Sequence, residues 1–415
     1  MKLPPAIAFT VLLLCTITQE TSANCLGPID KVSQNGQKSL YTGQQDFSLA
    51  LLNAINKLSP DDNLFFSPYS TYHALLIAFF LAGNQTEKFL RNTLRLDSSQ
   101  TKNDIHLAYK LDKLRTNFTS LQAAYEFTSA NKIFVGDDVP VRDCILDLFK
   151  DEIAITKFKT DAENARNQIN QWVEDRTNNM IKNLLPPGSV DELTDLVLVN
   201  AAYFKGMWLK KFNPSETRQE IFYVSPTKQI MVDMMHLEGT FNYEVSETLG
   251  AHILEMPYKG EDVSMYILLP PFSKTNRALE NTLSKLTLQE FSNIVEGKNS
   301  FSHTVQVSLP KFSLEQTIEL VPVLEELGVG DLFESTRDLS TLSPKPTKLD
   351  QAVHKSRIEV TEDGTEAASS TVLFSFRSSR PIEPAQFNCN HPFIYIIYNK
   401  AERATLFMGV FRSPN

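Results

Sequence analysis

The chain has 415 residues, of which 42% are hydrophobic and 21% are charged. This is ordinary globular composition, with enough apolar material for a large core. A formal net charge of −9 excludes general nucleic-acid binding, which needs a basic surface. Neither composition nor charge points to a catalytic class.

The N-terminus has the three parts of a secretory signal. Lys2 provides the positive charge, residues 6–15 form the apolar core, and Thr21-Ser22-Ala23 supply the small residues of a cleavage site. The apolar run is too short to span the ~30 Å of hydrocarbon in a bilayer, so a membrane anchor is disfavoured. We predict that residues 1–23 are a signal peptide and that residues 24–415 form one secreted, extracellular domain with no membrane segment.

Secretion leads to two further expectations. The sequons that begin at Asn84 and Asn117 become candidate glycosylation sites. Cys25, Cys144 and Cys389 remain after cleavage, and this odd number argues against a disulfide framework. Because no Cys-x-x-Cys or metal-like Cys/His spacing is present, we expect buried or terminal thiols and no metal site.

Apolar periodicity predicts the elements in chain order. Residues 47–58 and 164–183 have the spacing of amphipathic helices. Residues 193–204 contain a nearly continuous apolar run, which is typical of a strand buried on both faces. Segments rich in β-branched and aromatic residues predict further strands at 263–269, 303–309, 393–398 and 405–411. Helices dominate the first half and strands the second, which predicts an α+β fold built on large sheets.

One connection does not fit a compact domain. Residues 364–384 begin with small residues, end with two prolines and have no helical periodicity. A structureless connection of about 20 residues normally signals function or disorder.

The sequence contains no local catalytic motif. It has no Gly-x-Ser-x-Gly, His-Glu-x-x-His, Walker A or Gly-x-Gly-x-x-Gly pattern. A triad assembled only in space stays open. His354 is flanked by apolar residues, and a lone histidine in such a setting is usually a hydrogen-bonded structural group. We therefore expect no enzyme and no cofactor.

Five short stretches, spread over nearly the whole mature chain, resemble the serpin family in motif and order. They lie at residues 63–70 (NLFFSPYS), 200–208 (NAAYFKGMW), 309–312 (LPKF), 391–393 (HPF) and 406–409 (LFMG). The resemblance implies a single domain with three β-sheets, about nine helices and an exposed reactive-centre loop at about residues 362–384.

The resemblance also assigns structural roles. Ser67, Ser70, Asn200 and His354 resemble the serpin shutter, where two strands of the large sheet must part. Small polar groups suit that place because their hydrogen bonds can be exchanged and need not be lost. Trp208 resembles the tryptophan of the breach, at the top of the same sheet. None of these residues is expected to be catalytic.

Residues 361–371 resemble the proximal hinge of inhibitory serpins, which enters the large sheet as a new strand. Alternate residues of a strand face opposite sides, so the inward-facing positions must be small and uncharged. The four inward positions meet this condition and are Thr365, Ala367, Ser369 and Thr371. A flexible linker of the same composition is the alternative. The full hinge assignment is Glu362, Gly364, Thr365, Glu366, Ala367, Ala368, Ser369, Ser370 and Thr371. Asp363 stands where the family usually has Glu and is expected to be exposed to solvent.

Two arguments place the scissile bond differently. Most inhibitory serpins are cleaved after the fifteenth residue counted from the hinge. The same count from Gly364 places the scissile bond at Ser378-Ser379, which suggests an elastase-like target. Chemistry favours Arg377-Ser378, because Arg377 can pair with the buried acid of a trypsin-like specificity pocket. Phe376 keeps a chymotrypsin-like target open, whereas Arg380 is followed by a proline that restricts its bond. We favour Arg377-Ser378.

The resulting functional prediction is a secreted, monomeric suicide inhibitor of an extracellular serine protease. The sequence also resembles arthropod haemolymph serpins, many of which restrain immune or melanisation cascades. By that analogy alone, an immune or clotting-type pathway is expected. The alternative is a non-inhibitory carrier, storage protein or chaperone with the same fold.

A glycosaminoglycan cofactor has weak support. The cations that could bind it lie in a predicted helix and are Lys102, Lys110, Lys113 and Arg115. Asp104 and Asp112 interrupt them, which favours a solvated face of mixed charge.

Overall fold

The computed structural model describes residues 25–27, 36–122, 125–273, 277–334, 338–363 and 383–414. The predicted signal peptide lies outside the described residues. So do the hinge from Gly364 onward and both candidate scissile bonds, because residues 364–382 are not described.

Nine α-helices occur among the described residues. They are α2 (Gly36–Leu58), α3 (Pro68–Leu81), α4 (Asn84–Thr93), α5 (Lys102–Gln122), α6 (Asp143–Leu148), α7 (Phe158–Arg176), α8 (Arg277–Lys285), α9 (Leu288–Val295) and α10 (Leu320–Glu326). The helix predicted at 47–58 is confirmed as part of α2.

The second predicted helix ends earlier than its apolar spacing indicated. Helix α7 stops at Arg176, not at residue 183. Asn178 and Asn179 follow with φ of 51° and 62°, a left-handed backbone that cannot continue a helix. Ile181 is buried all the same. Apolar spacing therefore extended the helix too far, because a buried residue after a helix looks like one more turn.

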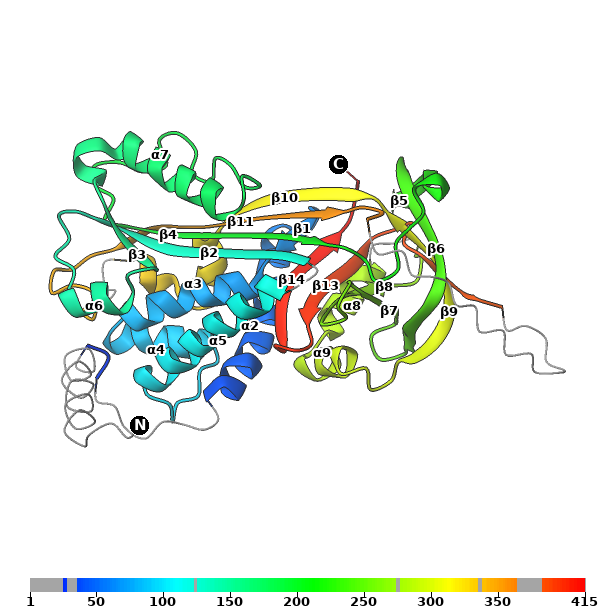
Figure 1. The fold of residues 1–415 in the computed structure, drawn as a ribbon, viewed down its shortest axis with the longest axis horizontal. Coiled ribbons are helices and arrows are strands. Elements are labelled where there is room, and N and C mark those ends of the chain that lie inside the picture. The colour runs from blue at the N-terminus through cyan, green and yellow to red at the C-terminus, as the bar shows by residue number, and fades with distance from the viewer. Residues whose placement is uncertain are drawn as a thin grey trace, which may run out of the picture.

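The first sheet has five strands, in the order β10 (Phe312–Glu319), β11 (Leu349–Val360), β4 (Leu196–Gly206), β2 (Tyr125–Gly136) and β3 (Ile153–Thr156). Helix α7 covers one face of this sheet and α3 lies under the other (Figure 1). The strand predicted at 193–204 is β4, whose first nine residues are all buried. Covering layers on both faces explain why its apolar run is nearly continuous.

The second sheet has nine strands. Its main path is β1 (Leu64–Phe66), β14 (Ala404–Phe411), β13 (Phe393–Asn399), β8 (Val263–Leu269), β7 (Ala251–Pro257), β6 (Lys228–Ser246), β9 (Phe301–Pro310) and β12 (Ala385–Asn388), and β5 (Arg218–Ser225) pairs with β6. All four strands predicted after residue 260 are confirmed within it.

The α+β prediction is confirmed, with one difference in sheet count. The resemblance implied three sheets, whereas hydrogen bonds join the described strands into two. Strand β6 is 19 residues long and is the reason. Its first part pairs with β5, its middle with β9 and its end with β7, so it connects two groups of strands into one sheet.

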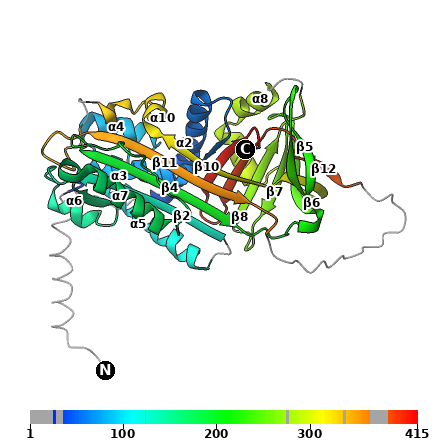
Figure 2. The same cartoon turned by 90° about the horizontal axis from the view of Figure 1, so that it is seen from above.

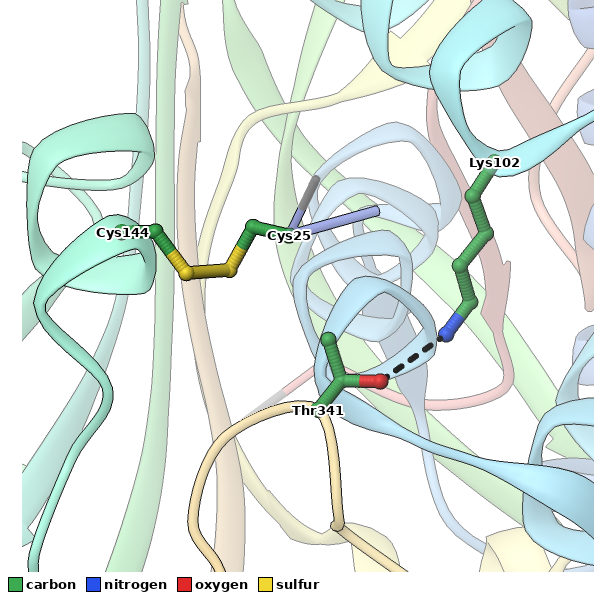
Figure 3. The surroundings of a disulfide bond; sticks show 4 residues. All are labelled: Cys25, Lys102, Cys144 and Thr341. Carbon is green, nitrogen blue, oxygen red and sulfur yellow. Dashed lines mark hydrogen bonds between the residues drawn. A yellow bond between two sulfur atoms is a disulfide. The ribbon is translucent and has the colours of Figure 1, made fainter. Parts of the chain in front are cut away.

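The prediction of buried or terminal thiols is wrong for two of the three cysteines. Cys25 and Cys144 form a disulfide between the N-terminal segment and α6, with a Cα–Cα distance of 5.9 Å (Figure 3). The Nδ2 of Asn103 donates to the Gly27 carbonyl (2.7 Å) and holds the same segment on α5. The odd cysteine is Cys389, which is free and buried, and burial raises the pKa of its thiol. Counting cysteines could not reveal a pair that packing brings together across 119 residues.

None of the described helices has both the length and the apolar character needed to cross a membrane.

Candidate functional site

The candidate site is the boundary between β4 and β11, which we call the seam. The two strands are hydrogen-bonded neighbours and run parallel, with a register from Leu196–Leu349 to Phe204–Ile358. The chain leaves β11 at Val360, and its next described strand is β12, in the other sheet. A new strand that returned from the end of β11 into the seam would be antiparallel to both of its neighbours.

A buried polar network lies at the middle of the seam. The four predicted shutter residues meet here, and each is fully buried: Ser67, Ser70, Asn200 and His354. Ser67 caps the N-terminus of α3, because its Oγ accepts from the Ser70 N–H (3.1 Å). The same Oγ donates to the Leu406 carbonyl of β14 (2.7 Å), so the cap holds the start of α3 on the nine-stranded sheet.

His354 connects the two sides of the seam. Its Nε2 accepts from the Ser67 N–H (3.0 Å), and its Nδ1 is hydrogen-bonded to the Asn200 Oδ1. These bonds place the proton on Nδ1, so the ring is neutral. Burial lowers the pKa of His354 to about 3. His354 and Asn200 are register partners across the seam, so parting the strands must break their bond.

Among the members of this network that sequence reasoning missed, two lie on β2. The Asn200 Nδ2 donates to Ser70 Oγ (2.6 Å) and to the Oδ1 of Asn131. The Ser70 hydroxyl also bonds to that of Ser129 (2.8 Å). Asn131 is the register partner of Asn200 in the β2–β4 ladder. No local signal marks Ser129 or Asn131, because only the strand register places them beside α3.

Trp208 lies just beyond the end of β4, at the end of the seam where β11 also finishes, and we call this the upper end of the seam. It is buried and stacks on Tyr258 with ring centroids 4.5 Å apart. Its Nε1 donates to the Thr361 carbonyl (2.9 Å), and its backbone N–H donates to the Asp363 carbonyl (3.1 Å). Trp208 therefore holds the backbone at the point where the predicted reactive loop begins.

Glu362 is buried at the same place and is paired. It accepts from the Lys311 Nζ (2.8 Å) and from the Thr217 Oγ1 (2.9 Å). Burial alone would raise the pKa of Glu362, but the hydrogen bonds from Lys311, from its own backbone and from Thr217 outweigh it and lower the pKa. The sequence placed Glu362 in the hinge and Lys311 in a family motif without linking them. Asp363 is exposed, as expected.

The family description "Serpin (serine protease inhibitor)" matches residues 42–414. The chain belongs to the serpin family.

Its relatives cover nearly the whole chain. It is 39% identical over 392 residues to serine protease inhibitor 88Ea of Drosophila melanogaster, and the matched region covers 91% of each chain. It is 34% identical over 394 residues to Serpin B3 of Homo sapiens, which spans 91% of this chain and 100% of that one. The solved structure of uncleaved ovalbumin has a TM-score of 0.80 and 28% identity, covering 91% of this chain and 100% of ovalbumin.

The structure describes one of the two predicted glycosylation sites of this serpin in more detail than the other. Asn84 is exposed at the first position of α4, where its Nδ2 donates to an Asp338 carboxylate oxygen (2.6 Å). Asn117 lies in α5, and its side chain is outside the described part of the structure. Glycosylation at both positions stays a prediction.

The predicted face of mixed charge does not form on α5. Lys102 is buried and donates to the Ala82 carbonyl, beside Thr341 (Figure 3). Asp112 is also buried. Lys113 is paired with Glu152. The prediction of a helix at these residues is confirmed, but the sequence did not show which of its charged side chains point inward.

Proposed function

We propose that this serpin is a secreted, single-use inhibitor of a trypsin-like serine protease, acting by insertion of its reactive loop into the seam. One observation carries the proposal: β11 leads directly into the loop, and its neighbour β4 runs parallel to it. A loop segment that folds back between them gains antiparallel ladders on both sides.

The chemistry is supplied by the protease. Its serine attacks the carbonyl carbon of Arg377, the bond to the Ser378 nitrogen breaks, and the Arg377 acyl group stays bound as an ester. Residues 364–377, inserted at ~3.3 Å per residue, would carry the ester ~45 Å along the sheet. That displacement distorts the attached protease before water can hydrolyse the ester. The serpin contributes no general acid or base.

The residues of the seam suit this movement. The His354–Asn200 bond would be broken, but both side chains keep other polar neighbours, namely Ser67 for the histidine and Ser70 for the asparagine. A network of small neutral groups can exchange partners at low cost, whereas a buried ion pair would leave unpaired charges. Insertion then adds ladder hydrogen bonds and buries apolar surface.

Secretion and target class rest on separate arguments. The Cys25–Cys144 disulfide is of the kind that persists in oxidising compartments and supports the predicted signal peptide. Arg377 supports a trypsin-like target because its guanidinium fits an acidic specificity pocket. Similarity to the Drosophila inhibitor supports the arthropod analogy, and with it an extracellular immune or clotting-type cascade.

The test is incubation of the mature protein with trypsin-, chymotrypsin- and elastase-like proteases, followed by denaturing electrophoresis and mass spectrometry. We expect a detergent-stable complex with the trypsin-like enzyme, cleaved after Arg377. Arg377→Ala should reduce the rate of complex formation by at least about 100-fold, because it leaves the acid of the pocket unpaired. The control Phe376→Ala should change it little.

The possible failures are distinguishable. A complex with an elastase-like enzyme, cleaved at Ser378-Ser379, would overturn the target class and leave insertion standing. Loop cleavage without any stable complex would favour the non-inhibitory carrier, storage protein or chaperone.

A further inference from the structure

Helix α5 is apolar on two faces, whereas a surface helix normally has one apolar stripe. Its inner face packs into the core through Ile105, Ala108 and Tyr109, which are all buried. Its outer face carries three leucines that stay largely exposed, namely Leu107 (40%), Leu111 (44%) and Leu114 (54%). Figure 2 shows α5 along one edge of the molecule. We call these three leucines the outer stripe.

The spacing of the outer stripe is that of a helix–helix contact. The leucines are separated by four and then three residues, which corresponds to positions d, a and d of a heptad. Scattered exposed leucines need no explanation, but a regular a/d row indicates a partner helix.

The charges beside the outer stripe indicate the partner's sign. In the heptad frame, Lys110 occupies position g and Arg115 position e, the positions that select coiled-coil partners by charge. Both residues are exposed. Lys110 has no ion-pair partner within the described part of the chain. The complementary surface therefore has acidic residues along its edges.

The helix is also firmly held. Asp112 of α5 points inward, and its carboxylate accepts hydrogen bonds from Tyr41 of α2 (2.9 Å), Tyr69 of α3 (2.8 Å) and the His73 Nε2 of α3 (3.0 Å). These bonds fasten α5 to two neighbouring helices. A partner would meet a preformed surface, so binding would not have to order the helix first.

We propose that α5 is a docking helix for a partner protein, which contributes an amphipathic α-helix with apolar residues at positions a and d and acidic residues at e and g. The proposal is independent of inhibition, because α5 does not belong to the seam.

Other occupants fit less well. A second copy of this chain would set Lys110 and Arg115 against their own copies, and like charges at e and g oppose pairing. An anionic membrane or polysaccharide has no apolar row to match the leucines and is held by many cations together. It would find few cations on this helix, because Lys102 is buried and Lys113 is paired.

The test uses two fluorescein-labelled helical peptides of three heptads, both with leucine at a and d. One has glutamate at every e and g position, and the other has lysine there. Fluorescence anisotropy with the full mature protein at physiological salt should show the acidic peptide binding at least about tenfold more tightly than the basic one.

Variants locate the binding. The triple change Leu107→Ser, Leu111→Ser and Leu114→Ser should weaken the acidic peptide at least about 30-fold, because the buried apolar area is lost. Lys110→Glu should remove most of the preference between the peptides, because it leaves one acidic and one basic residue beside the outer stripe. The matched control is Ile221→Ser with Met231→Ser, an exposed cross-strand pair on the β5–β6 hairpin (40% and 55% exposed), and it should leave binding unchanged.

Other results would overturn the proposal. These are equal affinity for both peptides, no binding, or unchanged affinity in the triple variant. A dimer in sedimentation that the triple variant abolishes would assign the stripe to a second copy, and pelleting with phosphatidylserine vesicles would assign it to a membrane. Binding that appears only in Ile29→Ser/Val32→Ser would mean that the chain's own residues 28–35 cover the stripe.

Discussion

The middle of the seam and its upper end hold the same region together by different means. In the middle, His354 and Asn200 meet in a fully buried network of neutral side chains. At the upper end, the Lys311–Glu362 ion pair fastens the base of the loop, and the lysine side chain is 42% exposed. Buried neutral hydrogen bonds are short-ranged and insensitive to salt, whereas an ion pair open to water is screened. We infer that the hydrogen bonds in the middle of the seam govern how readily β4 and β11 part. The ion pair at the upper end governs when the reactive loop begins to enter.

The largest effect should come from blocking entry at the upper end. Thr365→Arg would place an unpaired charge inside the sheet, at a cost of several kcal/mol. The variant should be cleaved by the protease without forming a stable complex, and its cleavage should not raise its unfolding temperature, whereas cleavage of the wild type should raise it. Thr365→Ser is the control and should inhibit normally. An unchanged complex yield in Thr365→Arg would contradict insertion.

A change far from the seam should separate stability from inhibition. Cys144→Ser opens the disulfide and should lower the free energy of unfolding by about 2–4 kcal/mol, measured by urea denaturation. The yield of protease complex should stay the same, because neither end of the seam is touched. The double variant Cys25→Ser/Cys144→Ser should match the single one. A large further loss of unfolding free energy in the double variant would show that the Cys25 side chain stabilises the protein by packing as well as through the disulfide.

The middle of the seam should respond to pH. The folded-state pKa of His354 is about 3, well below the unfolded value near 6.5. Below pH ~6.5 the unfolded chain therefore binds a proton that the folded protein does not, so stability falls as pH falls. The slope is up to ~1.4 kcal/mol per pH unit. His354→Gln should reduce the slope of unfolding free energy between pH 4 and 6.5, read from urea titrations.

Ser356→Ala is the control for that measurement. Ser356 is a buried neighbour whose Oγ donates to the Phe65 carbonyl (2.8 Å), and its side chain does not titrate in this range. Its removal should lower stability at every pH by a similar amount. If His354→Gln keeps the full wild-type slope, the histidine is not held neutral.

The smallest effect belongs to the ion pair at the upper end. A double-mutant cycle of Glu362→Gln and Lys311→Met should give a coupling free energy of ~0.5–1 kcal/mol, because the lysine is partly in water. The coupling should shrink in 1 M salt. A matching cycle on Asn200 and His354 should keep its value in salt. Equal salt sensitivity of the coupling free energy in both cycles would remove the distinction between the middle of the seam and its upper end.

Two helices and five strands could be predicted from local pattern, out of the nine α-helices and 14 strands among the described residues. The strand at 263–269 is found with the predicted bounds, and the family motifs brought Ser67, Ser70, Asn200 and His354 to one place. Strand and helix periodicities depend on neighbouring residues, and so the sequence reports them directly. The motif residues of the shutter lie on β1–α3, β4 and β11, elements that the family arranges in one way.

The sequence by itself determined the fold class and the family. Only the tertiary structure decided which partners meet: Cys25 with Cys144, Lys311 with Glu362, and Asn131 with Asn200. It also decided that Lys102 points inward while Leu107 points outward on the same helix. The physical reason is that these outcomes depend on which faces pack together. Contacts between residues far apart in the chain determine which faces pack together, and no local window of sequence contains both partners of such a contact.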